Sequence, residues 1–396
     1  MAMMSTVPVS RLQGATRLDA QFYQPSYVAV RAQMERLSTG TVSLGRIASF
    51  VRKGIFDIKA SSYTAEGVPF IRISNLKYGL IDDTDLVFLP PEIEASHLAT
   101  SLHDGDIVLS KTAYPAASLV TFEKCNISQD IIGVRISEQC RDKMRPGFVV
   151  GFLNTRYGNA LMAQWFQGNV QMHLALPDVR EIPIPLMPPG LQLEVENLWR
   201  EADRLFKESR DIFRKAEEML LREAGFVSWE PQRAVAFSRN MADILKSGRF
   251  DAEHHHPRVT ELRARVASYP HGTSSLMDVA DISTETVDPK SLAQESFLYV
   301  ELGSIYPTVG MIDWPARVHV AEAPSRARML LRAGDVILSS VQGSLDKVAL
   351  VSDDLDGAVG STGFFVLRPR RVESAYLLVL AKSLIVRGQL LAESTG

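Results

Sequence analysis

The chain has 396 residues and a formal net charge of −3 at pH 7, with 43 basic and 46 acidic side chains. This balance excludes a strongly basic protein, so any surface for nucleic acid has to be local. The two cysteines, Cys125 and Cys140, are too few for a disulfide framework and favour a reducing cytosol. The first eleven residues hold no apolar run of the signal-peptide kind, and the apolar stretch at 376–386 contains Lys382. We therefore expect two cytosolic domains and no membrane span.

The sequence contains a long internal repeat. Arg17-Leu18-Asp19-Ala20, followed by Pro25, reappears 232 residues later as Arg249-Phe250-Asp251-Ala252, followed by Pro257. Each copy then enters a predicted short helix, over 26–37 and 258–268. Further matches pair 70–73 with 299–302, 79–82 with 310–313, and 105–110 with 334–339. A period this long predicts a domain duplication rather than a solenoid.

Each copy has mostly strand signals, followed by a helix. Alternating apolar runs lie between Gly, Asp, Asn and Pro residues, which is typical of short strands. The first copy is predicted to close with a helix over 147–166 and the second with a helix over 374–392. Strands followed by helices indicate an α+β domain rather than a Rossmann-like one. The predicted strands are 70–73, 106–109 and 133–136 in the first copy, and 336–338, 348–351 and 364–367 in the second.

Several loops between the predicted strands are basic and flanked by aromatic residues. Lys and Arg neutralise phosphates, and Arg, Gln and Ser can reach base edges in a groove, so these loops are candidate DNA contacts. Arg52 and Tyr114 are the expected base-proximal positions of the first copy, and Gln342 and Ser344 those of the second. Solvated surface charge is the alternative explanation of the same loops. The candidates are Arg52, Lys53, Lys59, Lys111 and Tyr114, then Gln342, Ser344 and Lys347.

Motifs of catalytic chemistry are missing from the sequence. It has no phosphate-binding loop, no dinucleotide-binding glycine pattern, no nucleophile elbow and no His-Glu-x-x-His zinc pair. Three adjacent histidines, His254-His255-His256, cannot all face one metal ion without a severe bend, so we interpret them as surface or packing residues. Cys125 has no nearby histidine and is interpreted as a buried apolar residue. We expect no catalytic site and no metal site in this chain.

A long helix is predicted over 190–224. Pro183, Pro185, Pro188 and Pro189 give it an extended lead-in, and Gly225 is a natural stop. Its apolar residues repeat at spacings of three and four, as in a helix that pairs along one narrow stripe. An ordinary amphipathic helix packed on a globular core is the alternative. The seam comprises Val195, Leu198, Ala202, Leu205, Ser209, Ile212, Ala216 and Met219.

Three segments follow from this organisation: a first β-rich domain over 1–186, a spacer helix with its linker over 187–240, and a second β-rich domain over 241–396. With Gly158 aligned to Gly388, the second copy runs out at 393–396, level with the region around Gln167-Gly168 in the first, before any counterpart of 176–185 or of the long helix. We expect the second domain to be truncated there. An unpartnered apolar stripe would then need a partner helix, from a second copy of the chain or from another protein.

The order of these features resembles the specificity subunit of type I restriction-modification systems. The resemblance rests on two divergent domains, each with an Arg-Leu/Phe-Asp-Ala entry and a Gly-Asp-Ile/Val strand, and on the Ile182-Pro183-Ile184-Pro185 segment before a long helix. It implies two target recognition domains that bind the two halves of a bipartite, asymmetric double-stranded DNA site. It also implies docking to modification subunits, which bind S-adenosylmethionine and methylate adenine, and to an ATP-dependent restriction subunit, in a bacterial or archaeal cytosol.

The resemblance implies that the chain is non-catalytic and holds no cofactor of its own. The alternative from another class is a coiled-coil assembly protein whose two β-rich domains bind protein instead of DNA. The salt dependence of binding distinguishes these two hypotheses. Affinity that comes from phosphate contacts falls steeply as salt rises, whereas the affinity of an apolar protein interface does not.

Overall fold

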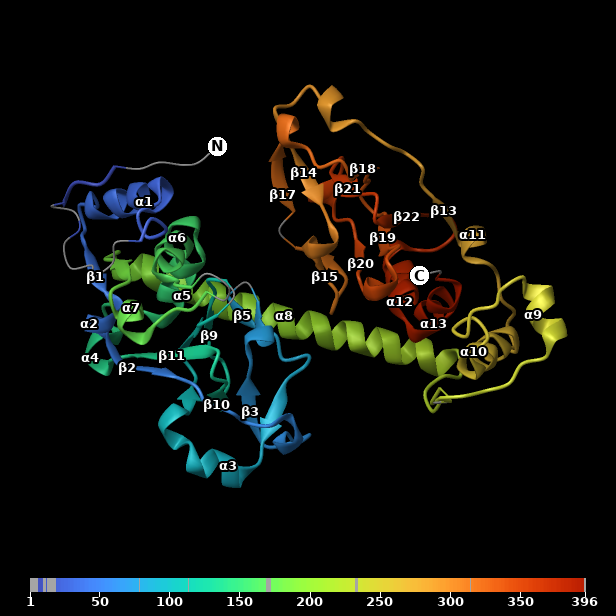
Figure 1. Cartoon of the computed structure of the whole chain (residues 1–396), viewed down its shortest axis with the longest axis horizontal. Helices are drawn as coiled ribbons and strands as arrows, with labels where there is room; N and C mark the ends of the chain where they lie inside the picture. Colours follow the sequence, from blue (N-terminus) through green and yellow to red (C-terminus); the bar gives the residue numbers. More distant parts are fainter. Residues whose placement is uncertain are drawn as a thin grey trace. The chain divides into compact units, whose positions relative to one another are not determined.

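The computed structural model describes residues 6–9, 12, 19–77, 79–112, 114–168, 172–231, 234–313 and 315–394. The chain divides into two compact units, Met1–Leu205 and Phe206–Gly396, and the boundary falls inside the long helix (Figure 1). Arg17 and Leu18 of the first repeated motif lie outside the described residues, as do Thr395 and Gly396.

Unit 1 is built on two four-stranded sheets, with strand orders β2-β11-β8-β9 and β6-β3-β10-β7, and two small two-stranded pairs. Its strands are β1 (Thr41–Ser43), β2 (Ala48–Lys53), β3 (Val68–Ile71), β4 (Leu76–Lys77), β5 (Leu80–Ile81), β6 (Val87–Leu89), β7 (Leu102–His103), β8 (Ile107–Ser110), β9 (Ala117–Leu119), β10 (Lys124–Ile127), β11 (Ile131–Ile136) and β12 (Pro183–Pro185). Its helices are α1 (Pro25–Glu35), α2 (Leu44–Ile47), α3 (Pro91–Ser96), α4 (Glu138–Arg141), α5 (Pro146–Asn154), α6 (Arg156–Trp165) and α7 (Leu176–Arg180).

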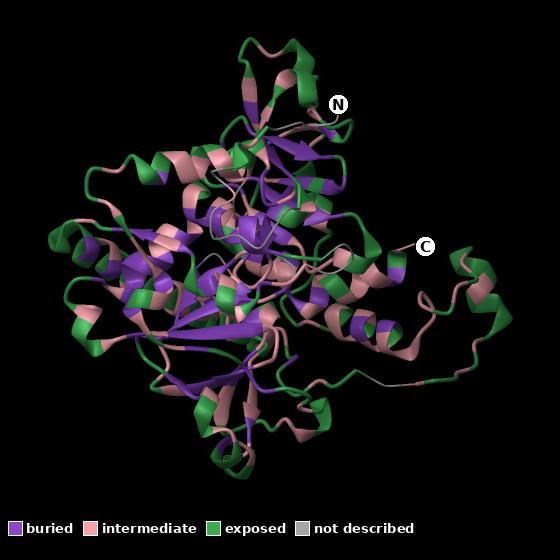
Figure 2. Cartoon of the chain, turned by 60° about the vertical axis from the view of Figure 1, so that its left-hand side comes forward, coloured by how far each residue is buried: buried purple, intermediate pink, exposed green. Residues whose placement is uncertain are grey.

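Unit 2 repeats this plan with a six-stranded sheet, β13-β22-β19-β20-β16-β15, and a four-stranded sheet, β17-β14-β21-β18. Its strands are β13 (Ala280–Ile282), β14 (Ser296–Val300), β15 (Ile305–Tyr306), β16 (Met311–Ile312), β17 (Ala316–His319), β18 (Ala327–Leu330), β19 (Val336–Ser339), β20 (Val348–Leu350), β21 (Val359–Ser361) and β22 (Phe364–Pro369). Its helices are α9 (Met241–Ser247), α10 (Pro257–Ala267), α11 (Leu276–Val279), α12 (Ser374–Lys382) and α13 (Leu384–Glu393). In each unit the buried side chains concentrate in the strands (Figure 2).

The predicted α+β duplication is confirmed by matched contacts. Arg135 forms an ion pair with Asp106, which is 1% exposed, and Arg368 forms the equivalent pair with Asp335, which is also 1% exposed. Each arginine lies on an inner strand, and each aspartate directly precedes the neighbouring strand. Each buried carboxylate also accepts a backbone N–H three residues earlier, from His103 for Asp106 and from Arg332 for Asp335. The same charge pair therefore fixes the turn before β8 in unit 1 and before β19 in unit 2.

The repeated aspartate of the entry motif has the same role in both copies. Asp19 Oδ1 accepts a hydrogen bond from the backbone N–H of Phe22 at 2.9 Å, and Asp251 Oδ1 accepts one from His254 at 3.0 Å. Such Asx turns reverse the chain locally. They lead directly into α1 and α10, and each of these helices begins at the proline that the repeat identified.

The prediction of one continuous closing helix in each copy is wrong. The chain breaks at Thr155 between α5 and α6, and at Ser383 between α12 and α13. Both residues have extended backbone angles, and each hydroxyl donates to a carbonyl three residues earlier, from Thr155 to Phe152 at 2.7 Å and from Ser383 to Leu380 at 2.6 Å. Hydroxyl side chains compete in this way with the helical hydrogen-bond pattern.

Within the described residues, no single helix has the length and apolar character needed to cross a membrane. Helices α12 and α13 satisfy that test only as a pair, and they are bent by 61° at their junction.

The predicted long helix is confirmed as α8, Pro189–Glu223. Its 35 residues give a length of about 50 Å at 1.5 Å per residue. Gly225, with φ of 74°, ends it: the N–H of Phe226 donates to Leu221 O at 2.7 Å and the N–H of Gly225 donates to Arg222 O at 3.1 Å. This is a Schellman cap, and Phe226 packs against Leu221 as the cap requires.

Buried polar side chains attach the first half of α8 to unit 1. Gln192 donates to the backbone oxygens of Lys143 and Met187 and accepts from the N–H of Arg145. Glu196 accepts from the N–H of Gly147 at 3.1 Å, and a side chain at Gly147 would lie within 2.8 Å of Glu196. Helix α8 therefore docks on unit 1 through directional hydrogen bonds together with apolar packing of Val195 and Trp199.

The predicted seam faces away from this contact. Leu198, Leu205, Ile212 and Met219 are exposed, by 64, 50, 59 and 68%, and we call these four residues the exposed stripe. Val195 departs from the prediction because it packs against the core of unit 1. In the second half of α8, Phe206 contacts Tyr306 and Phe213 lies under the Lys382 ammonium. The contacts of this half of the helix within unit 2 thus also use a face other than the exposed stripe.

Candidate nucleic-acid interface

The loops that follow β2 and β8 meet at one end of the first sheet of unit 1. Lys53 pairs with Ile132 of β11, and Ser110 pairs with the adjacent Ile131. Lys53 and Lys111 therefore flank the start of a single intervening strand, and neighbouring strands lie about 4.8 Å apart. The structure brings together two loops that are more than fifty residues apart in the sequence.

The cationic side chains near this end of the sheet differ in whether they already have a polar partner. Within the described part of the chain, no ion pair holds the ammonium groups of Lys53, Lys59 and Lys111. Arg52 donates from Nη1 to the backbone oxygen of Ala99 at 3.2 Å and lies over the ring of Phe50. The three lysines could therefore contact phosphate without first breaking a salt bridge. Arg52 would have to give up its hydrogen bond to the backbone oxygen of Ala99.

Tyr114 is held by the fold. Its hydroxyl donates to the backbone oxygen of Leu76 at 3.2 Å, and partial burial raises its pKa. The ring remains 45% exposed. The sequence-predicted base contact can therefore offer an aromatic surface, while its hydroxyl is already engaged.

The equivalent loop of unit 2, between β19 and β20, is anchored in a related way. Lys347 donates from Nζ to the backbone oxygen of Ile305 at 3.1 Å, and Ile305 occupies the position in β15 that Leu76 occupies in β4. The hydroxyl groups of Ser344 and Ser339 are 2.9 Å apart, which ties the loop to the end of β19. Of the three predicted contacts in this loop, Gln342 alone is fully exposed.

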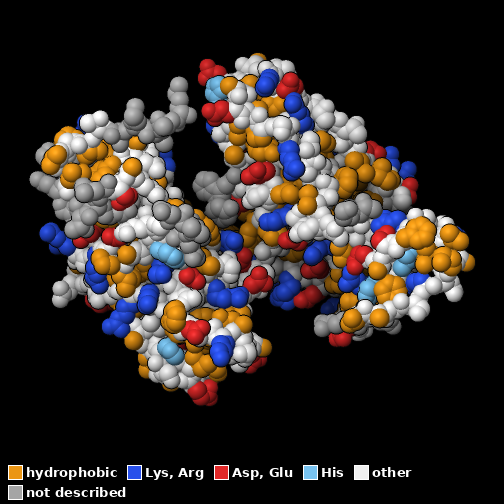
Figure 3. All heavy atoms as spheres, in the orientation of Figure 1, with side chains coloured by type: hydrophobic (Ala, Val, Ile, Leu, Met, Phe, Trp, Pro, Cys, Tyr) orange, Lys and Arg blue, Asp and Glu red, His pale blue; other side chains and the backbone are white. Residues whose placement is uncertain are grey.

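Charge also distinguishes the two copies at the opposite end of the sheet, where β19 begins. The segment that follows β13 carries Glu285, whose carboxylate pairs with Arg332 at 2.8 Å and with Arg368 at 3.3 Å. These arginines lower the pKa of Glu285. Sequence reasoning did not identify this network, because its members lie 47 and 83 residues apart. On the face drawn in Figure 3, basic and acidic side chains are interspersed, as the balanced composition predicts.

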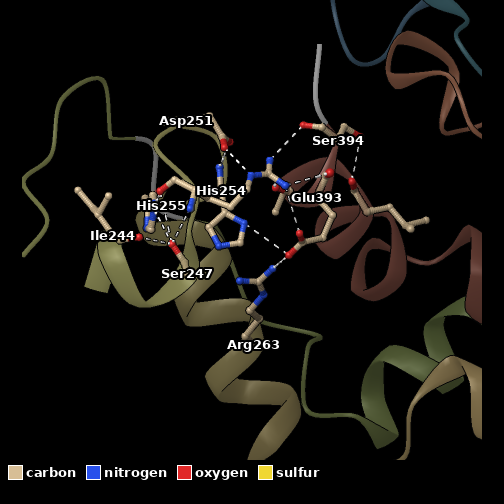
Figure 4. Close-up of polar contacts among 11 residues, drawn as sticks. Ile244, Ser247, Asp251, His254, His255, Arg263, Glu393 and Ser394 are labelled. Atoms are coloured by element: carbon tan, nitrogen blue, oxygen red, sulfur yellow. Dashed lines mark hydrogen bonds and ion pairs between the residues drawn. The ribbon is translucent and has the colours of Figure 1, made fainter. Parts of the chain in front are cut away.

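All three histidines contact the chain itself, and Figure 4 shows His254 and His255. His255 Nε2 is 2.7 Å from the backbone oxygen of Arg249, and His256 caps the start of α10. His254 Nδ1 lies 3.5 Å from Glu393 Oε1. These contacts agree with the packing interpretation. Among the described residues, no group of three or more His, Cys, Asp and Glu side chains is placed to hold a metal ion.

Cys125 is buried in the core of unit 1, and burial raises the pKa of its thiol. A protonated, inaccessible thiol is a poor nucleophile, in agreement with the interpretation of this residue as a small apolar one.

The fold and these loops define a class of protein: a duplicated α+β module with candidate nucleic-acid contacts at equivalent strand ends, and one long helix that carries an exposed apolar stripe. Neither a family model nor a curated protein matches the chain. Among solved structures, the chain is similar to specificity subunits of type I restriction-modification systems.

The structural matches differ in extent. The HsdS subunit from Thermoanaerobacter tengcongensis is 40% identical over 27% of this chain and 28% of that one, with a TM-score of 0.26. The S subunit from M. genitalium is 11% identical, with 87% of this chain and 76% of that one covered and a TM-score of 0.36. A chain from a structure on complex assembly and conformational transition of the type I R-M system is 17% identical, with 87 and 79% covered and a TM-score of 0.29. The first of these matches spans less than a third of the T. tengcongensis chain.

Proposed function

We propose that the chain is the DNA-binding specificity subunit of a type I restriction-modification complex. The observation that carries the proposal is the duplication: one module occurs twice, and its loops at the equivalent strand ends differ in charge and side-chain type. Two modules with different contact loops suit a bipartite, asymmetric DNA site. Specificity from the two halves adds without contact to the base pairs between them.

In the first half-site, Lys53, Lys59 and Lys111 would neutralise phosphates, and Arg52 and Tyr114 would lie near bases. In the second half-site, Gln342 and Ser344 would take the base-proximal role and Lys347 would support the loop. Phosphate contacts position a protein on the duplex, whereas base-edge contacts give sequence preference. The free ammonium groups of unit 1 and the exposed amide of Gln342 support this division of roles.

The exposed stripe on α8 would bind a helix of a partner in the complex. Exposed apolar residues at a spacing of seven suit a coiled-coil seam. We propose that the 1–186 and 241–396 domains recognise DNA, and that the helix and linker over 187–240 dock modification subunits, with a restriction subunit joining that assembly. Methyl transfer would take place in the modification subunit, which would bind S-adenosylmethionine, while this chain would contribute sequence recognition and no catalytic group.

The second candidate function is a coiled-coil assembly protein, and the exposed stripe is the observation that favours it. In that case both modules would bind protein. The discriminating measurement is the affinity of the purified chain for duplex DNA as salt rises, because release of counterions from phosphate makes log K fall linearly with log salt.

Co-expression with a modification subunit tests the proposed function directly. We expect methylated adenines to appear in the host genome within one split sequence motif, as mapped by sequencing that detects the modified base. A matched strain that carries the modification subunit alone controls for methylation without this chain. An assembled complex that adds no split motif to the host genome would refute the proposal.

A further inference from the structure

Phe56 is an exposed aromatic residue at a rigid loop tip. It lies between two isoleucines that anchor the loop: Ile55 is 4% exposed in a small core with Phe70 and Leu89, and Ile58 packs against the same core. Phe56 itself is 71% exposed. The fold buries Ile55, partly buries Ile58, and leaves the larger side chain of Phe56 in solvent. We call Phe56 and Asp57 the 56–57 tip.

Backbone hydrogen bonds hold the start of the tip in place. The N–H of Gly54 donates to Ile131 O at 3.0 Å and the N–H of Ile55 donates to Ile127 O at 2.8 Å. A side chain at Gly54 would lie 2.1 Å from the oxygen of Ile127, so this close approach requires glycine. A short 3-10 turn that begins after Lys59 closes the other side of the loop. The tip is therefore presented by fixed backbone rather than by a flexible loop.

Asp57 has a backbone conformation that side chains rarely adopt. Its φ of 58° makes it the non-glycine residue with positive φ among the described residues. A positive φ costs less free energy for aspartate than for most non-glycine residues, and outliers of this kind concentrate at turns and at functional sites. The Asp57 carboxylate is exposed and has no hydrogen-bond partner within the described residues, so it is free to accept a donor from a ligand.

Two free cations flank the tip. Lys53 Nζ lies 5.9 Å from the centroid of the Phe56 ring, and Lys59 is exposed on the other side of Asp57. An aromatic ring and a single acceptor between two unpaired ammonium groups match the chemistry of DNA, in which base edges lie between two phosphate backbones. The carboxylate favours the major groove, because cytosine presents an exocyclic amino donor there, whereas the minor groove offers mainly acceptors.

We propose that the 56–57 tip contacts base edges in the major groove of double-stranded DNA, with Phe56 against a thymine methyl group and Asp57 accepting from the amino group of a cytosine. This inference deepens the proposed function of unit 1 and rests on it. It assigns base recognition to two residues beside the lysines that would contact phosphate.

The test uses the full chain and a 40-base-pair duplex that the wild-type chain selects from a random pool, with an unrelated duplex of the same length as the reference. Phe56→Ala should bind the selected duplex about tenfold more weakly and leave binding to the unrelated duplex unchanged. The salt slope should not change, because an apolar contact releases no counterions. Phe250→Ala is the matched control, since Phe250 is similarly exposed, at 75%, but belongs to unit 2.

Modified DNA makes the test specific for the methyl contact. Replacing the thymines of the selected duplex by deoxyuridine should weaken binding by the wild-type chain. It should not weaken binding by Phe56→Ala any further, because that variant has already lost the methyl contact. Asp57→Asn should shift the preference at one base pair from cytosine towards adenine, because the amide both donates and accepts. Thermal unfolding of each variant, expected to match the wild type, checks that the fold is intact.

The outcomes separate this inference from the proposed function. If the wild-type chain selects no sequence from the pool, the proposed function fails and the tip assignment fails with it. If the chain selects a sequence but Phe56→Ala binds it as the wild type does, or deoxyuridine weakens both proteins alike, the tip assignment alone is overturned.

Discussion

Replacing Leu205 by glutamate tests the exposed stripe on α8. Leu205 is 50% exposed in the chain, and the other members of the stripe are exposed by 59 to 68%. Covering the exposed half or more of such a side chain contributes about 1 kcal/mol per residue, since full burial of a Leu or Ile contributes about 1.5 to 3 kcal/mol. A glutamate in the seam would lose this contribution and place a carboxylate against apolar groups.

The combined loss for Leu205→Glu is about 2 to 4 kcal/mol of association free energy, or about 30-fold to 1,000-fold in affinity. The free energy of unfolding of the isolated chain should change by less than about 1 kcal/mol, because the position is exposed there. Light scattering gives the solution mass, and co-purification reports binding of a modification subunit.

Arg204→Glu is the matched control, because it introduces the same side chain one residue earlier, where the arginine is exposed and pairs with the exposed Glu201. It should leave assembly intact. The stripe is not an interface if Leu205→Glu assembles like the wild type, or if both variants lose assembly equally.

Four other variants test contacts described above. Replacing Lys53 or Lys111 by alanine should weaken binding to all duplexes alike and make the salt slope shallower by about one unit each, and an unchanged slope would leave both as ordinary surface charges. Gln342→Ala should relax base preference in one half-site only, which sequencing of selected DNA would reveal; relaxation in both half-sites would contradict separate modules. Burial lowers the pKa of Lys382 to about 8, so the unfolded chain binds more protons than the folded one between about pH 8 and its ordinary 10.5. The free energy of unfolding should therefore rise across that window, by on the order of 3 kcal/mol at most, and Lys382→Met should remove the rise in urea titrations; a rise that persists in the variant belongs to other groups.

The repeat and the long helix were predictable because each leaves a local signal in the sequence. The Asp19 and Asp251 motifs mark the same turn in both copies, and a three-four spacing marks a helical face wherever the helix packs. The exposed stripe follows from this spacing alone.

The breaks in the closing helices were not predictable from periodicity. Thr155 and Ser383 interrupt apolar runs that read as single helices, and the hydroxyl bonds that favour the break are visible only in three dimensions. The docking of Gln192 and Glu196 was missed for a related reason. Polar residues on a helix are ordinarily assigned to the solvent face, whereas here the backbone N–H groups of α5 select the buried ones.

The candidate interface was predictable as a set of loops but not in its detail. Strand register placed the loops of Lys53 and Lys111 together, and no local pattern specifies such register across sixty residues. The same holds for Tyr114 and Lys347, whose side chains turn out to anchor their loops to the backbone of neighbouring strands. Side-chain type indicated cationic and polar loops, while tertiary contacts decide which groups remain available.

The break at Ser383 lets an apolar segment of membrane-spanning length fold as two short helices in unit 2. Helices α12 and α13 together cover Ser374 to Glu393, and a straight helix of that length would extend about 30 Å, the thickness of the hydrocarbon core of a bilayer. Its composition is apolar enough to satisfy the criterion for a membrane span only when the two parts are joined. In the fold, a hydroxyl at the junction and a 61° bend divide this segment into two helices that are each too short to span a bilayer. Its apolar side chains pack inside unit 2 instead, where Leu377, Leu378, Ala381, Ile385 and Ala392 are buried.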